Sequence, residues 1–205
     1  MLKKTLIVLV LIILYSCNKR KEITEYYSNG KVKEECEYID GQKNWIVRNY
    51  YDNGQVQTEV FKKDSLAHGK ELSYHPNGKL RSEGENKDGQ RIGLFKFYYD
   101  NGILEAEEFY VNGLLDGTSK EYYQNGKIKT IYSFTGGKKD GLFKYFYETG
   151  KIKKIEGYKN GEGFSDKQYN EDGKVYYYAT VDSGLLVYKG NWIPLDTALI
   201  NKNKK

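Results

Sequence analysis

The chain has 205 residues, of which 30% are charged and 39% hydrophobic, and its formal net charge is +5. Tyrosine supplies much of the hydrophobic fraction, with 21 Tyr against 8 Phe and 2 Trp. A tyrosine ring can cover a sheet while its hydroxyl stays in water. This composition argues against a globule with a thick aliphatic core and favours a thin or elongated structure. Lys and Glu alternate without a concentrated basic face, which argues against nucleic-acid binding.

The first residues have the pattern of a secretory signal peptide. Lys3 and Lys4 precede an apolar run over residues 6–14, which is too short to span a bilayer as a helix. The run ends in Leu14-Tyr15-Ser16-Cys17, which resembles the bacterial lipobox, although tyrosine is unusual at its second position.

This resemblance implies cleavage before Cys17 and lipidation of that cysteine. The alternative is an ordinary signal peptide with an incidental cysteine. We therefore expect a signal peptide over residues 1–16 and a lipidated Cys17 with a short polar tether over residues 17–21. Such a chain would be a membrane-anchored lipoprotein of the bacterial cell envelope, in the outer membrane rather than the inner one. Several acyl chains anchor a protein firmly.

The rest of the chain is an internal repeat of 24 residues, which is best seen at the glycine that closes each Asn-Gly-like turn. These turn glycines are Gly30, Gly54, Gly78, Gly102, Gly126, Gly150 and, one residue early, Gly173. Positions below are counted from this glycine in each unit. Spacing this regular indicates one supersecondary unit per repeat, stacked on its neighbours.

Other columns of the repeat confirm the register. Position −4 is always aromatic: Tyr26, Tyr50, Tyr74, Tyr98, Tyr122, Phe146 and Tyr169. Position +2 is always aliphatic: Val32, Val56, Leu80, Leu104, Ile128, Ile152 and Val175. Position +11 is Gly in six of seven units, with Ser65 as the exception. Position −9 is Gly at Gly69, Gly93, Gly117 and Gly141, whereas Trp45 and Phe164 depart from it.

Each unit thus predicts two short strands joined by an Asn-Gly turn. A three-residue loop, with a type I turn followed by a left-handed glycine, pairs position −4 with position +2. A two-residue type I′ loop would pair position −3 with +2 instead. Only the first form sets the aromatic column opposite the aliphatic column, and Pro76 suits the second residue of a type I turn. We expect the three-residue loop and an all-β, elongated antiparallel meander of about seven stacked hairpins.

Units such as Gly93-Leu-Phe-Lys-Phe-Tyr-Tyr-Asp-Asn-Gly102 resemble the bacterial variant of the MORN repeat. The resemblance spans residues 22–184. It implies a rod of stacked hairpins that contacts another molecule, and it offers no catalytic residues. Many bacterial proteins of this type are described as antitoxins of a YwqK-type toxin–antitoxin system. A cytoplasmic antitoxin needs no lipid anchor, so Cys17 counts against that role.

The C-terminal end of the array is expected to cap the stack. We expect a cap strand over residues 185–193 and a polar, disordered tail over residues 194–205.

The candidates for chemistry are few, and no catalytic residue, metal ligand or cofactor is predicted. His75 replaces the tyrosine of position −3, and His68 lies beside a turn glycine. A column of acids at position +5 favours cross-strand pairing with Lys over a calcium or sugar site: Glu35, Glu59, Glu83 and Glu107. Cys36 has no second cysteine in the mature chain and is expected to be a small buried residue.

The sequence therefore favours a non-enzymatic, lipid-anchored scaffold that contacts an envelope protein. The candidate contact surface is a column of tyrosines at position −3: Tyr27, Tyr51, Tyr99, Tyr123 and Tyr147. These rings could equally serve only to cover the sheet. Two alternatives stay open: an antitoxin or immunity protein, and a cell-wall polysaccharide binder, although polysaccharide-binding aromatic arrays are richer in Trp.

Overall fold

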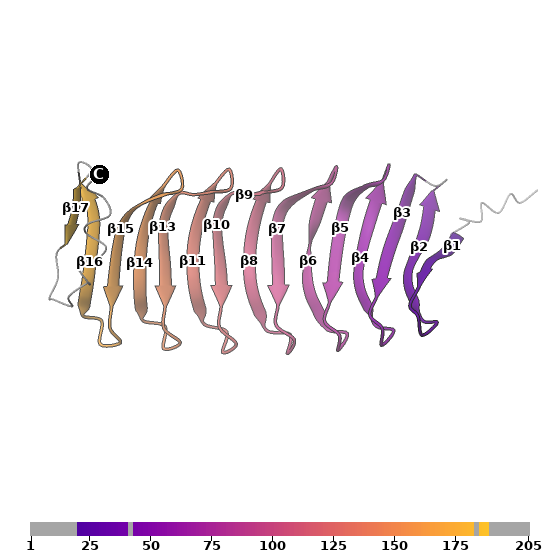
Figure 1. Cartoon of the computed structure of the whole chain (residues 1–205), viewed down its shortest axis with the longest axis horizontal. Coiled ribbons are helices and arrows are strands. Elements are labelled where there is room, and N and C mark those ends of the chain that lie inside the picture. Colours follow the sequence, from indigo (N-terminus) through magenta and orange to yellow (C-terminus); the bar gives the residue numbers. More distant parts are fainter. Residues whose placement is uncertain (1–19, 41–42, 183–184, 189–205) are drawn as a thin grey trace, which may run out of the picture.

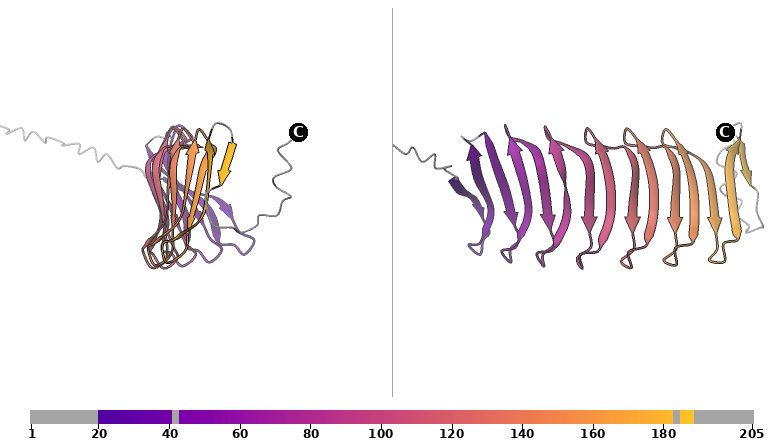
Figure 2. Two further views of the ribbon diagram at one scale, coloured as in Figure 1. Left: turned by 90° about the vertical axis from the view of Figure 1, so that its left-hand side faces the viewer. Right: turned by 180° about the vertical axis from the view of Figure 1, so that it is seen from behind.

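All regular structure in the described part of the chain is β-strand, and the strands form one antiparallel sheet. A computed structural model describes residues 20–40, 43–182 and 185–188. Seventeen strands follow one another along an elongated ribbon (Figures 1 and 2). The predicted all-β array of stacked hairpins is confirmed. Within the described residues, no helix is both long and apolar enough to cross a bilayer.

The strands have the following bounds: β1 Arg20–Tyr26, β2 Val32–Asp40, β3 Asn44–Tyr50, β4 Val56–Lys63, β5 Leu66–Tyr74, β6 Leu80–Lys87, β7 Gln90–Tyr98, β8 Leu104–Val111, β9 Leu114–Leu115, β10 Gly117–Tyr122, β11 Ile128–Thr135, β12 Lys138–Lys139, β13 Gly141–Phe146, β14 Ile152–Lys159, β15 Glu162–Tyr169, β16 Val175–Asp182 and β17 Leu185–Tyr188.

Each strand pairs with the strand that follows it, as in a meander. The two-residue strands β9 and β12 are the only interruptions in the described sheet, and there β8 continues to β10 and β11 to β13. The breaks lie at Asp116 and Asp140. Their N–H groups donate to carbonyls of the preceding strand, Asp116 to Phe109 and Asp140 to Ser133, and a left-handed glycine follows each aspartate.

The Asn-Gly turns have the predicted three-residue form. In the first turn the N–H of Gly30 donates to the carbonyl of Tyr27 at 2.9 Å, and Gly30 has a φ of 81°. Position −4 faces position +2 in every unit, from Tyr26 opposite Val32 to Tyr169 opposite Val175. The predicted aromatic–aliphatic pairing is confirmed in all seven hairpins.

The turns described between residues 64 and 161 at the opposite edge are two-residue loops with both residues at positive φ, which is the type I′ geometry. Asp88 and Gly89 have φ values of 50° and 82°, and Asn112 and Gly113 have values of 49° and 78°. Ser65 is the non-glycine member of this column and still adopts a φ of 74°. Gly89, Gly113, Gly137 and Gly161 each donate the N–H to a carbonyl that lies just after the previous turn of this edge, so consecutive turns are tied together.

All of the buried side chains except Glu37 project from one face of the described sheet, which we call the core face. Its buried members are Cys36, Val47, Ser82, Asn86, Phe95, Ala106, Ser119, Thr130, Phe143 and Ala179. Phe95 is only 1% exposed and lies edge-on to Tyr110, with ring centroids 5.2 Å apart. Arg91 covers the same ring, with its guanidinium carbon 4.6 Å from the centroid. A core thus forms without a second layer.

Two strand glycines make room for aromatic rings. A Cβ on Gly84 would lie 2.4 Å from the ring of Phe95, and a Cβ on Gly157 would lie 2.5 Å from the ring of Phe164. Gly157 stands at position +7, next to Phe164 at position −9 of the next unit. At the equivalent site Ser133 lies against Gly141. Phe164 therefore departs from the glycine column because the small and large residues have exchanged places.

The ends of the sheet fall near the predicted boundaries of the array. β1 begins at Arg20, inside the segment predicted to be a tether, because Lys21 already pairs with Glu37 of β2. β17 lies within the range predicted for the cap strand and pairs with β16. The predicted signal peptide, Cys17 and the C-terminal tail lie outside the described residues.

Candidate interaction surface

The tyrosines of position −3 lie at the Asn-Gly edge, where they join consecutive repeats. Each is half-buried, and its hydroxyl donates to a backbone carbonyl of the next unit. Tyr27 donates to the carbonyl of Tyr50 at 2.6 Å, and Tyr99 to that of Tyr122 at 2.7 Å. Tyr51, Tyr123 and Tyr147 repeat the contact. The polar end of each candidate side chain is therefore already used inside the array.

His75 confirms this structural role for the column. It replaces the tyrosine of position −3, as predicted, and its Nε2 lies 2.7 Å from the carbonyl of Tyr98. The same edge carries further bonds between repeats. The amide of Asn53 donates to the carbonyl of Pro76 at 2.9 Å, and the Lys31 ammonium donates to the carbonyl of Asp52 at 2.8 Å. The tyrosine, asparagine and lysine side chains thus connect consecutive turns along this edge by hydrogen bonds.

The face opposite the core face carries an unbroken row of in-register residues across the middle of the strands. We call this face the charged face and this set the charged row. From β2 to β16 its members are Glu35, Arg48, Glu59, Leu72, Glu83, Lys96, Glu107, Lys120, Ile131, Lys144, Ile155, Lys167 and Tyr178. The predicted pairing of the position +5 acids with basic residues is confirmed where Lys96 lies between Glu83 and Glu107.

Three acids of the charged row, Glu35, Glu83 and Glu107, also accept hydrogen bonds from tyrosines of position −4, which the sequence did not reveal. Tyr98 donates to Glu83 at 2.7 Å, and Tyr122 donates to Glu107 at 2.7 Å. Burial and the adjacent carboxylate raise the pKa of each of these two phenols to about 12. Tyr98 and Tyr122 are therefore neutral donors at ordinary pH.

Arg48 holds the N-terminal part of the charged row together. Its Nε lies 2.6 Å from Glu59, and its Nη1 lies 2.7 Å from Glu37 and 3.3 Å from Glu35. Burial opposes ionisation of Glu35, but hydrogen bonds from Tyr50, Lys21 and Arg48 outweigh it and lower the pKa of that carboxyl. With three carboxylates around one guanidinium, this end of the row is net acidic.

The C-terminal part of the row has the opposite charge. Ile131, Ile155 and Tyr178 replace the acids, whereas Lys120, Lys144 and Lys167 keep the basic positions. Among the described residues, no carboxylate forms an ion pair with Lys120 or Lys144. The charged face is thus acidic towards β2 and basic towards β15.

Exposed apolar side chains lie beside the charged row, nearer the type I′ turns. Leu94 faces Phe109 across β7 and β8, and the two are 47% and 42% exposed. Leu142 is 48% exposed and faces Gly157, over which the ring of Phe164 lies. Ile46 and Phe61 form the equivalent pair on β3 and β4, where both side chains are partly buried.

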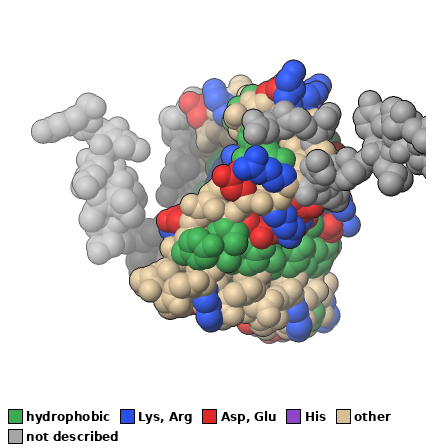
Figure 3. All heavy atoms as spheres, turned by 90° about the vertical axis from the view of Figure 1, so that its right-hand side faces the viewer, with side chains coloured by type: hydrophobic (Ala, Val, Ile, Leu, Met, Phe, Trp, Pro, Cys, Tyr) green, Lys and Arg blue, Asp and Glu red, His purple; other side chains and the backbone are tan. Residues whose placement is uncertain are grey.

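These apolar pairs occur in every second repeat. The intervening units carry Lys70 with Glu85, and Thr118 with Ser133, at the same positions. The apolar pairs of the charged face therefore recur every 48 residues, twice the unit of the fold. Figure 3, which views the ribbon from its N-terminal end, shows hydrophobic, acidic and basic side chains side by side.

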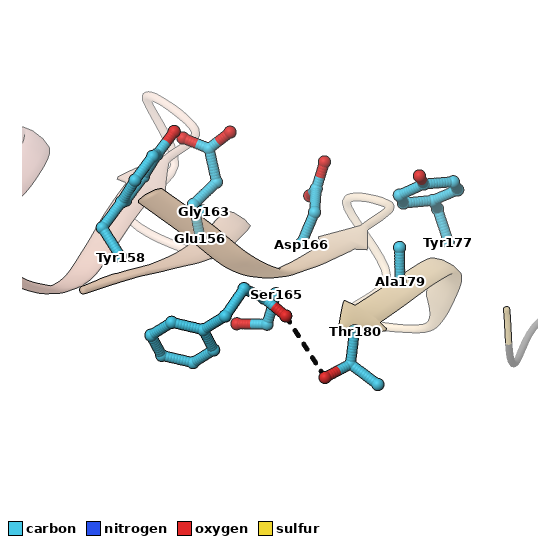
Figure 4. A pocket seen from close by; sticks show the side chains of 9 residues that line it. Glu156, Tyr158, Gly163, Ser165, Asp166, Tyr177, Ala179 and Thr180 are labelled. Atoms are coloured by element: carbon cyan, nitrogen blue, oxygen red, sulfur yellow. Dashed lines mark hydrogen bonds between the residues drawn. The ribbon is translucent and has the colours of Figure 1, made fainter. Parts of the chain in front are cut away.

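A shallow pocket of about 230 Å³ lies where β14, β15 and β16 meet (Figure 4). Its side chains diverge from the sheet. Glu156, Asp166 and Tyr177 project on one side, whereas Ser165 and Thr180 project on the other. Lys154 lies 2.6 Å from Glu156 and 3.5 Å from Asp166, so the carboxylates are already paired with a cation. The hydroxyls and carboxylates do not converge on one reaction centre.

The remaining candidates for chemistry, Cys36 and His68, lie in surroundings that suit a structural role. Cys36 is buried, as predicted, and burial raises the pKa of its thiol. His68 Nδ1 lies 3.3 Å from Asp88 Oδ1 beside the type I′ turn. No group of three or more potential metal ligands occurs in the part of the chain that the structure describes.

The fold and its repeated contacts define a class of protein: a single-layer array of β-hairpins in which the contacts that recur from unit to unit stack one hairpin on the next. The family model for the MORN repeat variant matches residues 21–40, 46–63, 67–87, 91–112, 115–135 and 139–160, and the chain belongs to that family. The seventh hairpin lies beyond the matched segments but keeps the same register. No curated protein matches the chain. Repeats of this family are generally associated with protein or membrane interaction.

Proposed function

We propose that the protein is a lipid-anchored, non-catalytic scaffold that mediates protein–protein contact at the bacterial cell envelope. One observation carries the contact role: half-exposed leucine and phenylalanine side chains stand beside a charged row on the face opposite the core. Single exposed apolar residues are ordinary on protein surfaces. Here they recur at fixed register along one face, as expected of a surface that contacts a partner.

The charged face supports this role better than the tyrosines of position −3. The hydroxyls of those tyrosines are bonded within the array, so they contribute only ring surface to a partner. The charged face offers both apolar area and charges of both signs. Such a combination gives affinity from the apolar centre and selectivity from the charges around it.

The lipid anchor rests on the sequence of the first residues. A short apolar run over residues 6–14 precedes Cys17, which lies three residues before β1 begins at Arg20. Three residues reach at most about 11 Å. An acylated Cys17 would therefore keep the β1 end of the ribbon beside the membrane surface, and we propose the outer membrane as its location.

The test is metabolic labelling with a palmitate analogue in a bacterial host. We expect label and membrane fractionation for the full chain, loss of both in Cys17→Ser, and no change in Cys36→Ser, which is the matched cysteine control. Soluble, unlabelled wild-type protein would refute the anchor. Crosslinked pull-down of the anchored protein from its native envelope then tests the contact role. Recovery of the bait alone, without any crosslinked protein, would contradict that role.

A further inference from the structure

We propose that the partner of the charged face is a second copy of this chain, packed face to face in the antiparallel sense. This inference rests on the proposed use of that face for contact, but not on the lipid anchor. Three features carry it: the order of charges along the row, the spacing of the apolar pairs, and the area available.

When two copies of the charged row face each other and run in opposite directions, charges of opposite sign lie opposite one another. A twofold axis parallel to the strands, placed between β7 and β8, brings each strand opposite its mirror position in the second copy. Lys96 then faces Glu107, Glu83 faces Lys120, and Leu72 faces Ile131 of the second copy. Further out, Glu59 faces Lys144 and Glu35 faces Lys167. Arg48 opposite Ile155 is the one ionic position without a charged counterpart, and Arg48 is already neutralised by its own glutamates.

The apolar pairs obey the same axis. Leu94 and Phe109 flank it, so each meets the other in the second copy. The Ile46–Phe61 pair meets Leu142 and the ring of Phe164, because both lie two repeats from the centre. Two repeats are four strands, or about 19 Å along the ribbon. Only a partner with this same spacing engages all three clusters at once.

The alternative twofold axis, which runs along the ribbon, is unfavourable. It would place each member of the charged row against itself, so that Glu83 meets Glu83 and Lys144 meets Lys144. Like charges in direct contact oppose association. The order of charges therefore selects the antiparallel arrangement.

The available area suits a stable dimer. The face from β2 to β15 comprises twelve full strands. At about 4.8 Å per strand this is about 58 Å, and four residues along each strand add about 14 Å in the other direction. The product is about 800 Å² per copy, which is the amount that a standard interface buries on each partner. Twisted sheets diverge away from the axis, so the contacts around Leu94 and Phe109 contribute most.

The first test uses Leu94→Asp in the full-length chain extracted with mild detergent, with molecular mass measured by sedimentation. We expect a dimer for the wild type and at least tenfold weaker self-association for the variant, because each dimer gains two buried charges at its centre. Leu114→Asp is the matched control. Leu114 is 52% exposed but lies in β9 beside a type I′ turn, and its variant should remain dimeric.

The second test fixes the orientation by charge exchange. Lys120→Glu should weaken the dimer about tenfold or more, and the double variant Glu83→Lys/Lys120→Glu should restore it, since the two positions face each other between copies. Thermal unfolding of each variant confirms that the fold persists. A wild-type monomer, a dimer insensitive to Leu94→Asp, or a double variant weaker than the single one would each overturn the proposal. Palmitate labelling reads the anchor separately, so the two failures are distinguishable.

Discussion

Individual glycines within the strands decide how aromatic rings pack against this single-layer sheet. Gly84 is not a turn residue and needs no unusual φ, yet a Cβ there would lie 2.4–2.5 Å from three ring atoms of Phe95. That ring is 1% exposed and enclosed by Tyr110 and Arg91, so it has little freedom to move. The requirement for glycine is therefore one of space.

We expect Gly84→Ala to lower the free energy of unfolding by about 1–3 kcal/mol, the usual effect of overpacking a rigid site. Denaturant unfolding followed by circular dichroism measures it. Adding Phe95→Leu should recover part of the loss, because the smaller side chain leaves room for the methyl group. A Gly84→Ala variant as stable as wild type would show that the ring moves aside freely.

The hydroxyls of the position −3 tyrosines join each repeat to the next by a single hydrogen bond. Tyr99→Phe removes the donor to the carbonyl of Tyr122 and nothing else. We expect a loss of about 1 kcal/mol in unfolding free energy, typical of one net hydrogen bond. Tyr123→Phe should behave alike, because its donor contact is the same. If these variants keep full stability but lose a partner in pull-down, the column serves contact instead.

The two strand glycines could not be predicted from the sequence, whereas the turn glycines could. Turn glycines recur in phase and produce a column. Gly84 and Gly157 stand in columns otherwise filled by other residue types. Each is required by the space that one particular ring occupies, Phe95 at Gly84 and Phe164 at Gly157. Such a pairing becomes visible only when the ring and the glycine are seen together. The exception of Phe164 in the −9 column was the one available signal.

At the scale of the hairpin, the asparagine of position −1 stabilises the loop. Its side-chain oxygen accepts the N–H of position +1, as Asn101 does from Ile103 at 2.9 Å and Asn125 from Lys127 at 3.0 Å. The amide group can also reach the next turn, as Asn77 does to the carbonyl of Asp100. Thr149 occupies this position in the sixth hairpin and makes no such bond through its side chain.

Thr149→Asn is therefore expected to stabilise the protein by about 0.5–1 kcal/mol, the contribution of one net hydrogen bond. Thermal or denaturant unfolding measures the gain. The reverse change, Asn125→Thr, is the matched control and should destabilise by a similar amount. Equal stability of both variants and wild type would mean that the asparagine oxygen contributes nothing to the turn.

The register of the hairpins was predictable because two columns and one proline agreed. Only the three-residue loop set aromatic against aliphatic positions and tolerated Pro76. The type I′ turns at the other edge were predicted only as glycine-rich. Asp88-Gly89 and Asn112-Gly113 carry the dipeptides that favour this geometry, but Ser65 and the variable residue before the glycine weaken the column.

At the scale of the whole molecule, the surface repeats less often than the fold. A column of the 24-residue repeat compares the same position in every unit. A residue type that occurs only in every second unit therefore gives no uniform column. The likeness of Gly93-Leu-Phe-Lys to Gly141-Leu-Phe-Lys was present in the sequence. Its meaning emerged only when register placed Leu94 beside Phe109 and Leu142 beside Gly157 on the face opposite the core.

The tyrosines bonded to glutamates make the whole array sensitive to alkali. Tyr50, Tyr98 and Tyr122 have pKa values raised from 10.0 to about 12. The first cause is burial, which disfavours the phenolate, and the second is the hydrogen bond that each hydroxyl donates to a neighbouring carboxylate. A pKa that is higher in the folded state than in the unfolded state stabilises the fold fully below the unfolded value. That contribution declines as pH rises from about 10 and is gone above about 12.

We therefore expect unfolding free energy to fall between about pH 10 and 12, in step with a late phase of tyrosinate absorbance. This absorbance reports phenols alone, so lysine deprotonation does not obscure it. Glu107→Gln removes the charge beside Tyr122 and should move that phenol towards the ordinary value, while Tyr122→Phe should delete its share of the late phase. Titration of all tyrosines in one step near pH 10, with the fold still intact, would contradict the bonded row. Because each such bond links one repeat to the next, its loss should loosen the stack along its length.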